Sequence, residues 1–264
     1  MSEAAATAGT SEKIQALLNW TMHHVQDSQA WHLPGGLVIH FPPWISLHAV
    51  MLLIVAGLMV LVFGKVYRKG PAAPTGATNL LEIFVVFIRD QVATMCLGKE
   101  DGRRYTPLLC TYFFFVAFCN LLGLIPLFAT ATGNISVTFA LATTSLGMIL
   151  IGGLLKNGPV GFVKSFLPHG VPWPILLIVG PLEFVGVFIK CFALMVRLFA
   201  NMLAGHIVIF CILGLIFVFG YTALPAVFLA LAIFLMEIFI ALLQAYIFTL
   251  LSAMFMGLVW HPAH

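Results

Sequence analysis

The sequence predicts an all-α membrane protein, and three observations support that prediction. Of its 264 residues, 62% are hydrophobic and only 8% are charged. The mean hydropathy of +1.10 lies far outside the range of soluble globular domains. Several apolar stretches reach about 20 residues, the length that a helix needs to cross a hydrocarbon core. A net charge of +3 without a basic patch also argues against nucleic acid as a partner.

The first element is a mixed segment, residues 1–46, which we expect on the extracytoplasmic side. It lacks the continuous apolar stretch and cleavage site of a signal peptide, and its acids outnumber Lys13, unlike an import presequence. These features predict a bacterial plasma (inner) membrane. The histidines here show no tight ligand pattern, so we expect neither a metal site nor a cofactor. The five cysteines of the chain are scattered, and we interpret them as small core residues.

The next two elements are a first transmembrane helix and a surface helix. The helix is predicted over residues 47–67, because an apolar run ends at Lys65, Arg68 and Lys69, a typical stop-transfer flank. Residues 80–104 are apolar but interrupted by charged groups, which predicts an amphipathic helix on the membrane surface.

Residues 105–173 predict a transmembrane hairpin and a loop. Two apolar runs of span length are joined by a short uncharged connection around Gly133 and Asn134, and a Pro/Gly-rich stretch follows them. Nine of the twelve Lys and Arg residues fall between 65 and 104 or between 156 and 164, two segments that this hairpin places on one side. Because cytoplasmic loops hold the excess of basic residues, we expect the N terminus outside and the C terminus in the cytoplasm.

Residues 174–264 predict a long helical hairpin. The stretch from Pro174 to Gly220 would extend roughly 70 Å as one helix, over twice the hydrocarbon thickness, so a single upright span is excluded. We expect two long, strongly tilted helices in an antiparallel pair, with a turn near Tyr221. Two pairs of upright spans with re-entrant turns would fit these lengths as well.

Ionisable residues inside this hairpin are costly, so each is a candidate for function. Glu183, Lys190 and Arg197 are spaced by seven residues and fall on one helix face. Asn201 extends that stripe by one turn, whereas His206 is turned about 180° away from Arg197. Arg197 and His206 therefore face different surroundings.

The second helix contributes Glu237 and Gln244, which are again seven residues apart and share a face. In an antiparallel pair folded about residue 221, residues equally distant from the fold meet. This register predicts one pair of His206 with Glu237 and another of Arg197 with Gln244, the second about 14 Å deeper along the helix.

The residue types suggest a proton path. An arginine cannot be deprotonated at accessible pH, but it can attract a carboxylate and block a leak, whereas a His and a Glu close together can exchange protons. The alternatives are structural: Lys190 reaching an interface or pairing with Glu183, Arg197 in an ion pair that fixes helix packing, and His206 as a packed histidine.

Five motifs resemble one known family, the a subunits of F-type ATP synthases. The most specific is VRLFANMLAGH, which places Arg197 at the family's essential arginine. The resemblance covers about residues 80–260, and Glu183, Lys190 and Gln244 fall on positions that are acidic, often basic and glutamine in the family. The other motifs are FCNLLGLIP (118–126), FLPHG (166–170), PLEF (181–184) and LLQAYIFTLL (242–251).

The resemblance implies a stator subunit of the proton channel, with two aqueous half-channels separated by Arg197. His206 and Glu237 would form the outer relay, with Glu183, Asn201 and Gln244 in the half-channels and Lys190 as a further candidate. Some members have an acid at the first relay position and a histidine at the second, so this chain has the exchanged arrangement. The implied partners are the c-subunit ring, peripheral-stalk b subunits, other ATP synthase subunits and the lipid bilayer.

Two other classes are compatible with buried charges. A secondary transporter or channel usually shows internal repeats, and none is evident in this sequence. A purely structural assembly subunit does not require titratable groups aligned across a hairpin. No P-loop is present, so we expect this chain to be non-catalytic and unable to make ATP itself.

Overall fold

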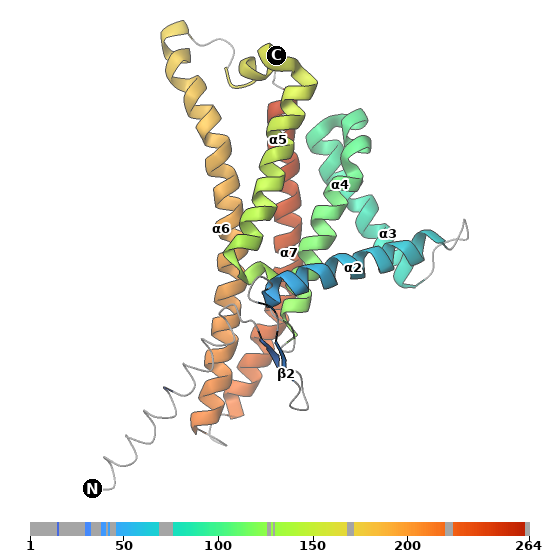
Figure 1. Cartoon of the computed structure of the whole chain (residues 1–264), viewed down its shortest axis with the longest axis vertical. Helices are drawn as coiled ribbons and strands as arrows, with labels where there is room; N and C mark the ends of the chain where they lie inside the picture. The colour runs from blue at the N-terminus through green and yellow to red at the C-terminus, as the bar shows by residue number, and fades with distance from the viewer. Residues whose placement is uncertain are drawn as a thin grey trace. The chain divides into compact units, whose positions relative to one another are not determined.

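The computed structural model is helical throughout most of the residues that it describes (Figure 1). Within those residues, five helices are long and apolar enough to cross a membrane. The predicted all-α membrane fold is therefore confirmed. The described residues are 15, 30–32, 38–40, 42, 46–68, 76–125, 128, 130–167, 172–219 and 224–261.

A short β-hairpin and the first long helix begin the described chain. Strand β1 (Ala30–His32) pairs with β2 (Val38–His40) in antiparallel register, with Trp31 opposite Ile39. The predicted all-α fold did not include this hairpin, and most of residues 1–46 lies outside the described residues. Helix α2 (Leu47–Arg68) ends among the basic residues that were expected to stop the first span.

The segment that we predicted as a surface helix, residues 80–104, is organised differently. Helix α3 (Ala77–Phe87) continues through a π-helical turn, η1 (Ile88–Ala93), into α4 (Thr94–Gly123). The break comes at Gly98, where φ is 79°, in the left-handed region that glycine adopts without a steric penalty. Residues 99–104 therefore lie on the far side of the break, in the same helical stretch as the next predicted span.

The predicted transmembrane hairpin has a short connection at the expected place. A single 3₁₀ turn, η2 (Ala131–Gly133), leads into α5 (Ile135–Lys164). Helix α5 is interrupted at Gly158, where φ is 66°, and Pro159 follows. Because proline has no N–H to donate, the helix restarts there instead of continuing. Residues 168–171, in the expected Pro/Gly-rich loop, lie outside the described residues.

Two long helices complete the chain. Helix α6 (Trp173–Phe219) has 47 residues, and α7 (Leu224–Trp260) has 37. Each is continuous, so the structure favours two long helices over two pairs of upright spans with re-entrant turns. The predicted turn around Tyr221 lies outside the described residues.

The chain divides into two compact units, and the long helices contribute to both. One unit combines Met1–Val55, Ala117–Asn134 and Phe199–Leu243. The other combines Ala56–Val116, Ile135–Leu198 and Gln244–His264. The predicted relay residues therefore fall in the first unit, and Arg197 and Gln244 fall in the second.

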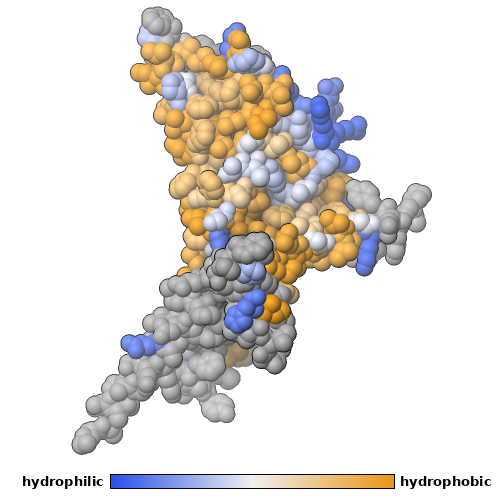
Figure 2. Space-filling view, in the orientation of Figure 1, coloured by the Kyte–Doolittle hydropathy of each residue, from blue (hydrophilic) through white to orange (hydrophobic). Residues whose placement is uncertain are grey.

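The core of the second unit forms where the C-terminal part of α7 packs against α4 and α5. The rings of Tyr112 and Phe248 meet edge to face at 5.8 Å. The indole of Trp260 donates a hydrogen bond to the carbonyl of Ile149 at 3.2 Å. Outside such contacts the described surface in Figure 2 is largely apolar, as expected of helices that face lipid.

Candidate functional site

The predicted polar residues lie on α6 and α7, which approach each other closely near Gly205. A Cβ atom at Gly205 would collide with the carboxyl group of Glu237. Glycine therefore leaves room for that carboxyl against the backbone of α6. This contact sets the register of the two helices within the first unit, with Glu237 beside the residue that precedes His206.

Glu237 is buried in this interface. Its side chain is 5% exposed, and neither carboxyl oxygen has a hydrogen-bond partner among the described residues. His206 interacts with it electrostatically. An isolated buried charge is costly, so the protonation state of this carboxyl depends on the titratable groups beside it.

His206 is half-buried and has defined partners for both ring nitrogens. Nδ1 lies 2.9 Å from the carbonyl oxygen of Met202, one turn earlier on α6. Nε2 lies 2.9 Å from the carbonyl oxygen of Gly123, at the end of α4, and 2.7 Å from Oγ1 of Thr130. At least these three groups hold the imidazole, close to the Glu237 carboxyl.

Arg197 lies exposed on α6. Among the described residues it has neither an ion pair nor a hydrogen bond. The structure therefore gives no support to an internal ion pair as its purpose. A guanidinium on an exposed face of a helix is available to a carboxylate of another chain.

Gln244 lies in the second unit and is only 4% exposed. Its amide nitrogen has no hydrogen-bond partner within the described part of the chain, so the structure does not join Gln244 to Arg197 by a bond. Asn201 is half-buried on α6, one turn beyond Arg197. Among the described residues, no hydrogen bond joins Arg197 to Asn201 or to Gln244, so the predicted cluster of these three side chains stays a prediction.

Glu183 and Lys190 pair with each other on α6. The Lys190 ammonium lies 4.0 Å from a carboxylate oxygen of Glu183, and the two side chains are 36% and 48% exposed. The same ammonium lies 5.6 Å from the centre of the Phe255 ring on α7. Of the alternatives considered for these two residues, the structure supports a salt bridge, supplemented by a cation–π contact.

Two polar groups near His206 were not singled out from the sequence. Thr130 and the carbonyl of Gly123 reach His206 from positions 76 and 83 residues away. Only the fold brings them together, and an uncharged threonine in a short connection gives no signal by itself. Asn120 is fully buried, donates to the Ala241 carbonyl at 3.3 Å and accepts from Thr132 at 2.7 Å.

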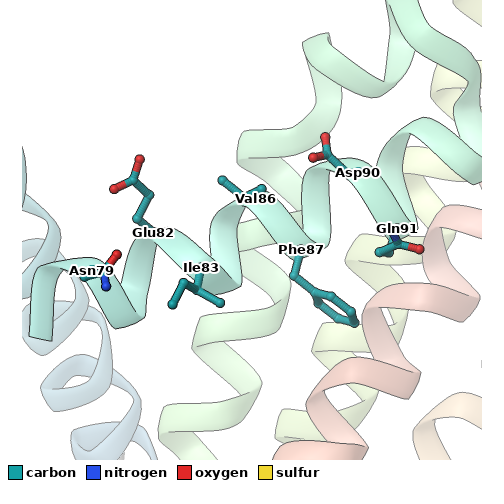
Figure 3. A pocket seen from close by; sticks show the side chains of 7 residues that line it. All are labelled: Asn79, Glu82, Ile83, Val86, Phe87, Asp90 and Gln91. Carbon is teal, nitrogen blue, oxygen red and sulfur yellow. The ribbon is translucent and has the colours of Figure 1, made fainter. Parts of the chain in front are cut away.

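An open pocket on α3 and η1 contains none of the predicted site residues. Figure 3 shows Glu82 and Asp90 pointing to one side of this helix and Ile83 and Phe87 to the other. Asp90 is paired with Arg89 at 2.7 Å. The pocket therefore displays the amphipathic character of the segment and has no unpaired cluster that would bind a ligand.

Comparison with known proteins points to one family. The model of the family described as ATP synthase A chain matches residues 48–257. ATP synthase subunit a of Myxococcus xanthus is 46% identical over 222 residues, covering 81% of this chain and 72% of the relative. The protein of the same name from Chloroherpeton thalassium is 44% identical over 271 residues, covering 96% and 79%.

Some relatives are considerably longer. The chain spans just over half, 56%, of ATP synthase subunit a of Anaeromyxobacter dehalogenans strain 2CP-C, to which it is 46% identical. The family model matches all of α6 and nearly all of α7. Both the family match and the relatives agree, so the chain belongs to the ATP synthase subunit a family, the non-catalytic proton-channel stator subunits of the F0 membrane sector.

Proposed function

We propose that this chain provides two aqueous half-channels, separated by Arg197, and passes protons to and from the carboxylates of a c-subunit ring. A proton entering by one half-channel neutralises a ring carboxylate, which can then face lipid. After the ring has turned, the proton leaves by the other half-channel. Proton flow is thereby coupled to ring rotation and to ATP synthesis by the catalytic part of the complex.

The observation that carries this proposal is that Arg197 is exposed and has no acidic partner among the described residues. It lies on a long apolar helix. A permanent cation at membrane depth is costly unless a carboxylate compensates it. A ring carboxylate is such a partner, and because Arg197 keeps its proton, it separates the two half-channels instead of joining them.

His206 and Glu237 form the outer relay in this proposal. The buried carboxyl of Glu237 against Gly205 and the electrostatic interaction with His206 support a unit in which a proton is shared. Asn201 and Gln244 are assigned to the half-channel walls near Arg197. The amide nitrogen of buried Gln244 has no partner among the described residues, and buried amides normally have one, so this group supports the assignment.

Glu183 and Lys190 are assigned to the half-channel on the opposite side from the relay. Both are more than one-third exposed, and their 4.0 Å pair is long, so either group can contact water. Lys190 is the weaker candidate, since its contact with the Phe255 ring also gives it a packing role.

The chain is a multi-pass membrane protein of a bacterial ATP synthase, and other subunits of that complex are its partners. We further propose contacts with the c ring and with peripheral-stalk b subunits in the plasma (inner) membrane. The distribution of Lys and Arg supports an N terminus outside and a C terminus in the cytoplasm. Protease accessibility of terminal tags in right-side-out and inverted vesicles tests this orientation.

The central test is ATP-driven proton pumping in inverted vesicles that contain the whole complex with Arg197→Ala. We expect pumping to be lost while the complex remains assembled. Phe192→Ala, at another exposed position of α6, is the matched control and should pump normally. Unchanged pumping by the Arg197 variant would overturn the barrier role.

A further inference from the structure

We propose that Thr130 is a positioning residue that gives His206 a hydrogen-bond partner in both of its protonation states. The inference rests on the proposed function of His206 as a proton relay. It adds a specific requirement: the imidazole must gain and lose a proton without changing its orientation. The atoms around its two nitrogens show how this requirement is met.

The Nδ1 atom is fixed as a donor. Its partner, 2.9 Å away, is the main-chain carbonyl oxygen of Met202, and a carbonyl can only accept. Nδ1 therefore keeps its proton. The nitrogen whose proton is exchanged is Nε2.

The Nε2 atom faces two oxygens of different chemistry. The carbonyl oxygen of Gly123, at 2.9 Å, can accept from Nε2–H but offers nothing to a deprotonated nitrogen. The hydroxyl of Thr130, at 2.7 Å, can both accept and donate. When Nε2 loses its proton, the Thr130 hydroxyl donates to its lone pair.

When Nε2 of His206 is protonated, its N–H also has hydrogen-bond acceptors. Nε2–H then donates to the Gly123 carbonyl and to Thr130, and the hydroxyl proton of Thr130 turns to the same carbonyl, 3.3 Å away. A carbonyl oxygen has two lone pairs, so it can accept from both groups. Both protonation states therefore find partners with the imidazole in one orientation.

The backbone supports this arrangement. A Cβ atom at Gly123 would lie 2.8 Å from the hydroxyl oxygen of Thr130 and 2.7 Å from its methyl group. Glycine thus permits the close approach of Thr130 to the end of α4. The residues from 117 to 134 contain no charged side chain, and Cys119 is their only titratable group. Among the described residues, Glu237 on α7 is a charged group that interacts with His206.

The test is the pH dependence of passive proton conduction and of ATP-driven pumping in vesicles with the assembled complex. Thr130→Val keeps the shape of the side chain but removes the hydroxyl that donates to deprotonated Nε2. The charged imidazole becomes favoured, so we expect the pH midpoint of conduction to rise by about 0.5 to 1 unit, a three- to tenfold change in the protonation equilibrium. Thr130→Ala should also raise the pH midpoint, whereas Thr130→Ser, which keeps the hydroxyl, should have the native midpoint.

Thr132→Val is the matched control. Thr132 lies two residues away, and its hydroxyl donates to Asn120 instead of His206. We expect its removal to lower stability without shifting the pH midpoint. A native midpoint in both Thr130→Val and Thr130→Ala, or an equal shift in Thr132→Val, would overturn the inference.

His206→Ala separates this inference from the proposed function. If His206→Ala conducts like the native chain, the relay itself is wrong. If His206→Ala loses conduction while the Thr130 variants keep the native midpoint, the relay stands and only the role of Thr130 fails.

Discussion

The carboxyl group of Glu237 on α7 occupies the space that a side chain at position 205 of α6 would fill. The packing of α6 against α7 and the position of the Glu237 carboxyl therefore depend on the same contact. The glycine that lets the helices approach also places a buried acid next to His206. Substitutions at this contact should therefore affect stability and proton transfer together.

Gly205→Ala tests this coupling. The added methyl group meets the Glu237 carboxyl, the far end of a flexible side chain, so this carboxyl must turn away, at or below the lower end of the about 1–3 kcal/mol that overpacking costs. We expect a lower melting temperature of the purified complex and a reduced pumping rate. Gly186→Ala is the control on the same helix, because no atom lies within 4 Å of its Cβ position. Equal behaviour of the two variants would contradict the close contact.

Exchange of the relay residues is the second prediction. A side chain positioned for proton transfer accelerates a reaction by about 10²–10⁴-fold. Either His206→Glu or Glu237→His alone should therefore reduce the pumping rate by at least tenfold. The double variant places an acid and a histidine beside each other again. We expect it to recover a large part of the rate, measured as ATP-driven quenching of a pH-sensitive dye. No recovery would show that the two residues act separately.

A third prediction concerns the packing of α7 in the second unit. A Cβ atom at Gly257 would collide with the main-chain carbonyl of Cys96, which cannot move without shifting the backbone before Gly98. Gly257→Ala should therefore destabilise the subunit by about 1–3 kcal/mol and lower the yield of assembled complex. Gly147→Ala on α5 has open space around it and should assemble normally.

The fourth prediction concerns a surface cluster in the same unit. Asp101 is paired with Lys156 and lies 2.9 Å from a ring nitrogen of His261, so it links α4, α5 and the end of α7. Partly exposed ion pairs contribute only about 0–1 kcal/mol to the free energy of unfolding, and salt screens their attraction. Asp101→Asn should lower the melting temperature slightly at low salt and not at high salt. A large loss at both salt concentrations would instead indicate a role in assembly.

The sequence by itself determined the fold class. The density of apolar residues forces helices in lipid, because every backbone polar group must be satisfied within the segment. The apolar stretches on either side of Tyr221 are likewise too long for single upright spans. The register argument from the turn placed Glu237 opposite His206, within one residue of the contact with Gly205 in the structure.

Only the tertiary structure decided the breaks and the long-range partners. The left-handed backbone at Gly98 interrupts the helix that we predicted over residues 80–104. The sequence pattern did not predict this break, because hydrophobic periodicity does not report the φ angle of a single residue. The Thr130 hydroxyl reaches His206 across 76 residues. Such a contact depends on how α4 ends against α6, and no local propensity encodes it.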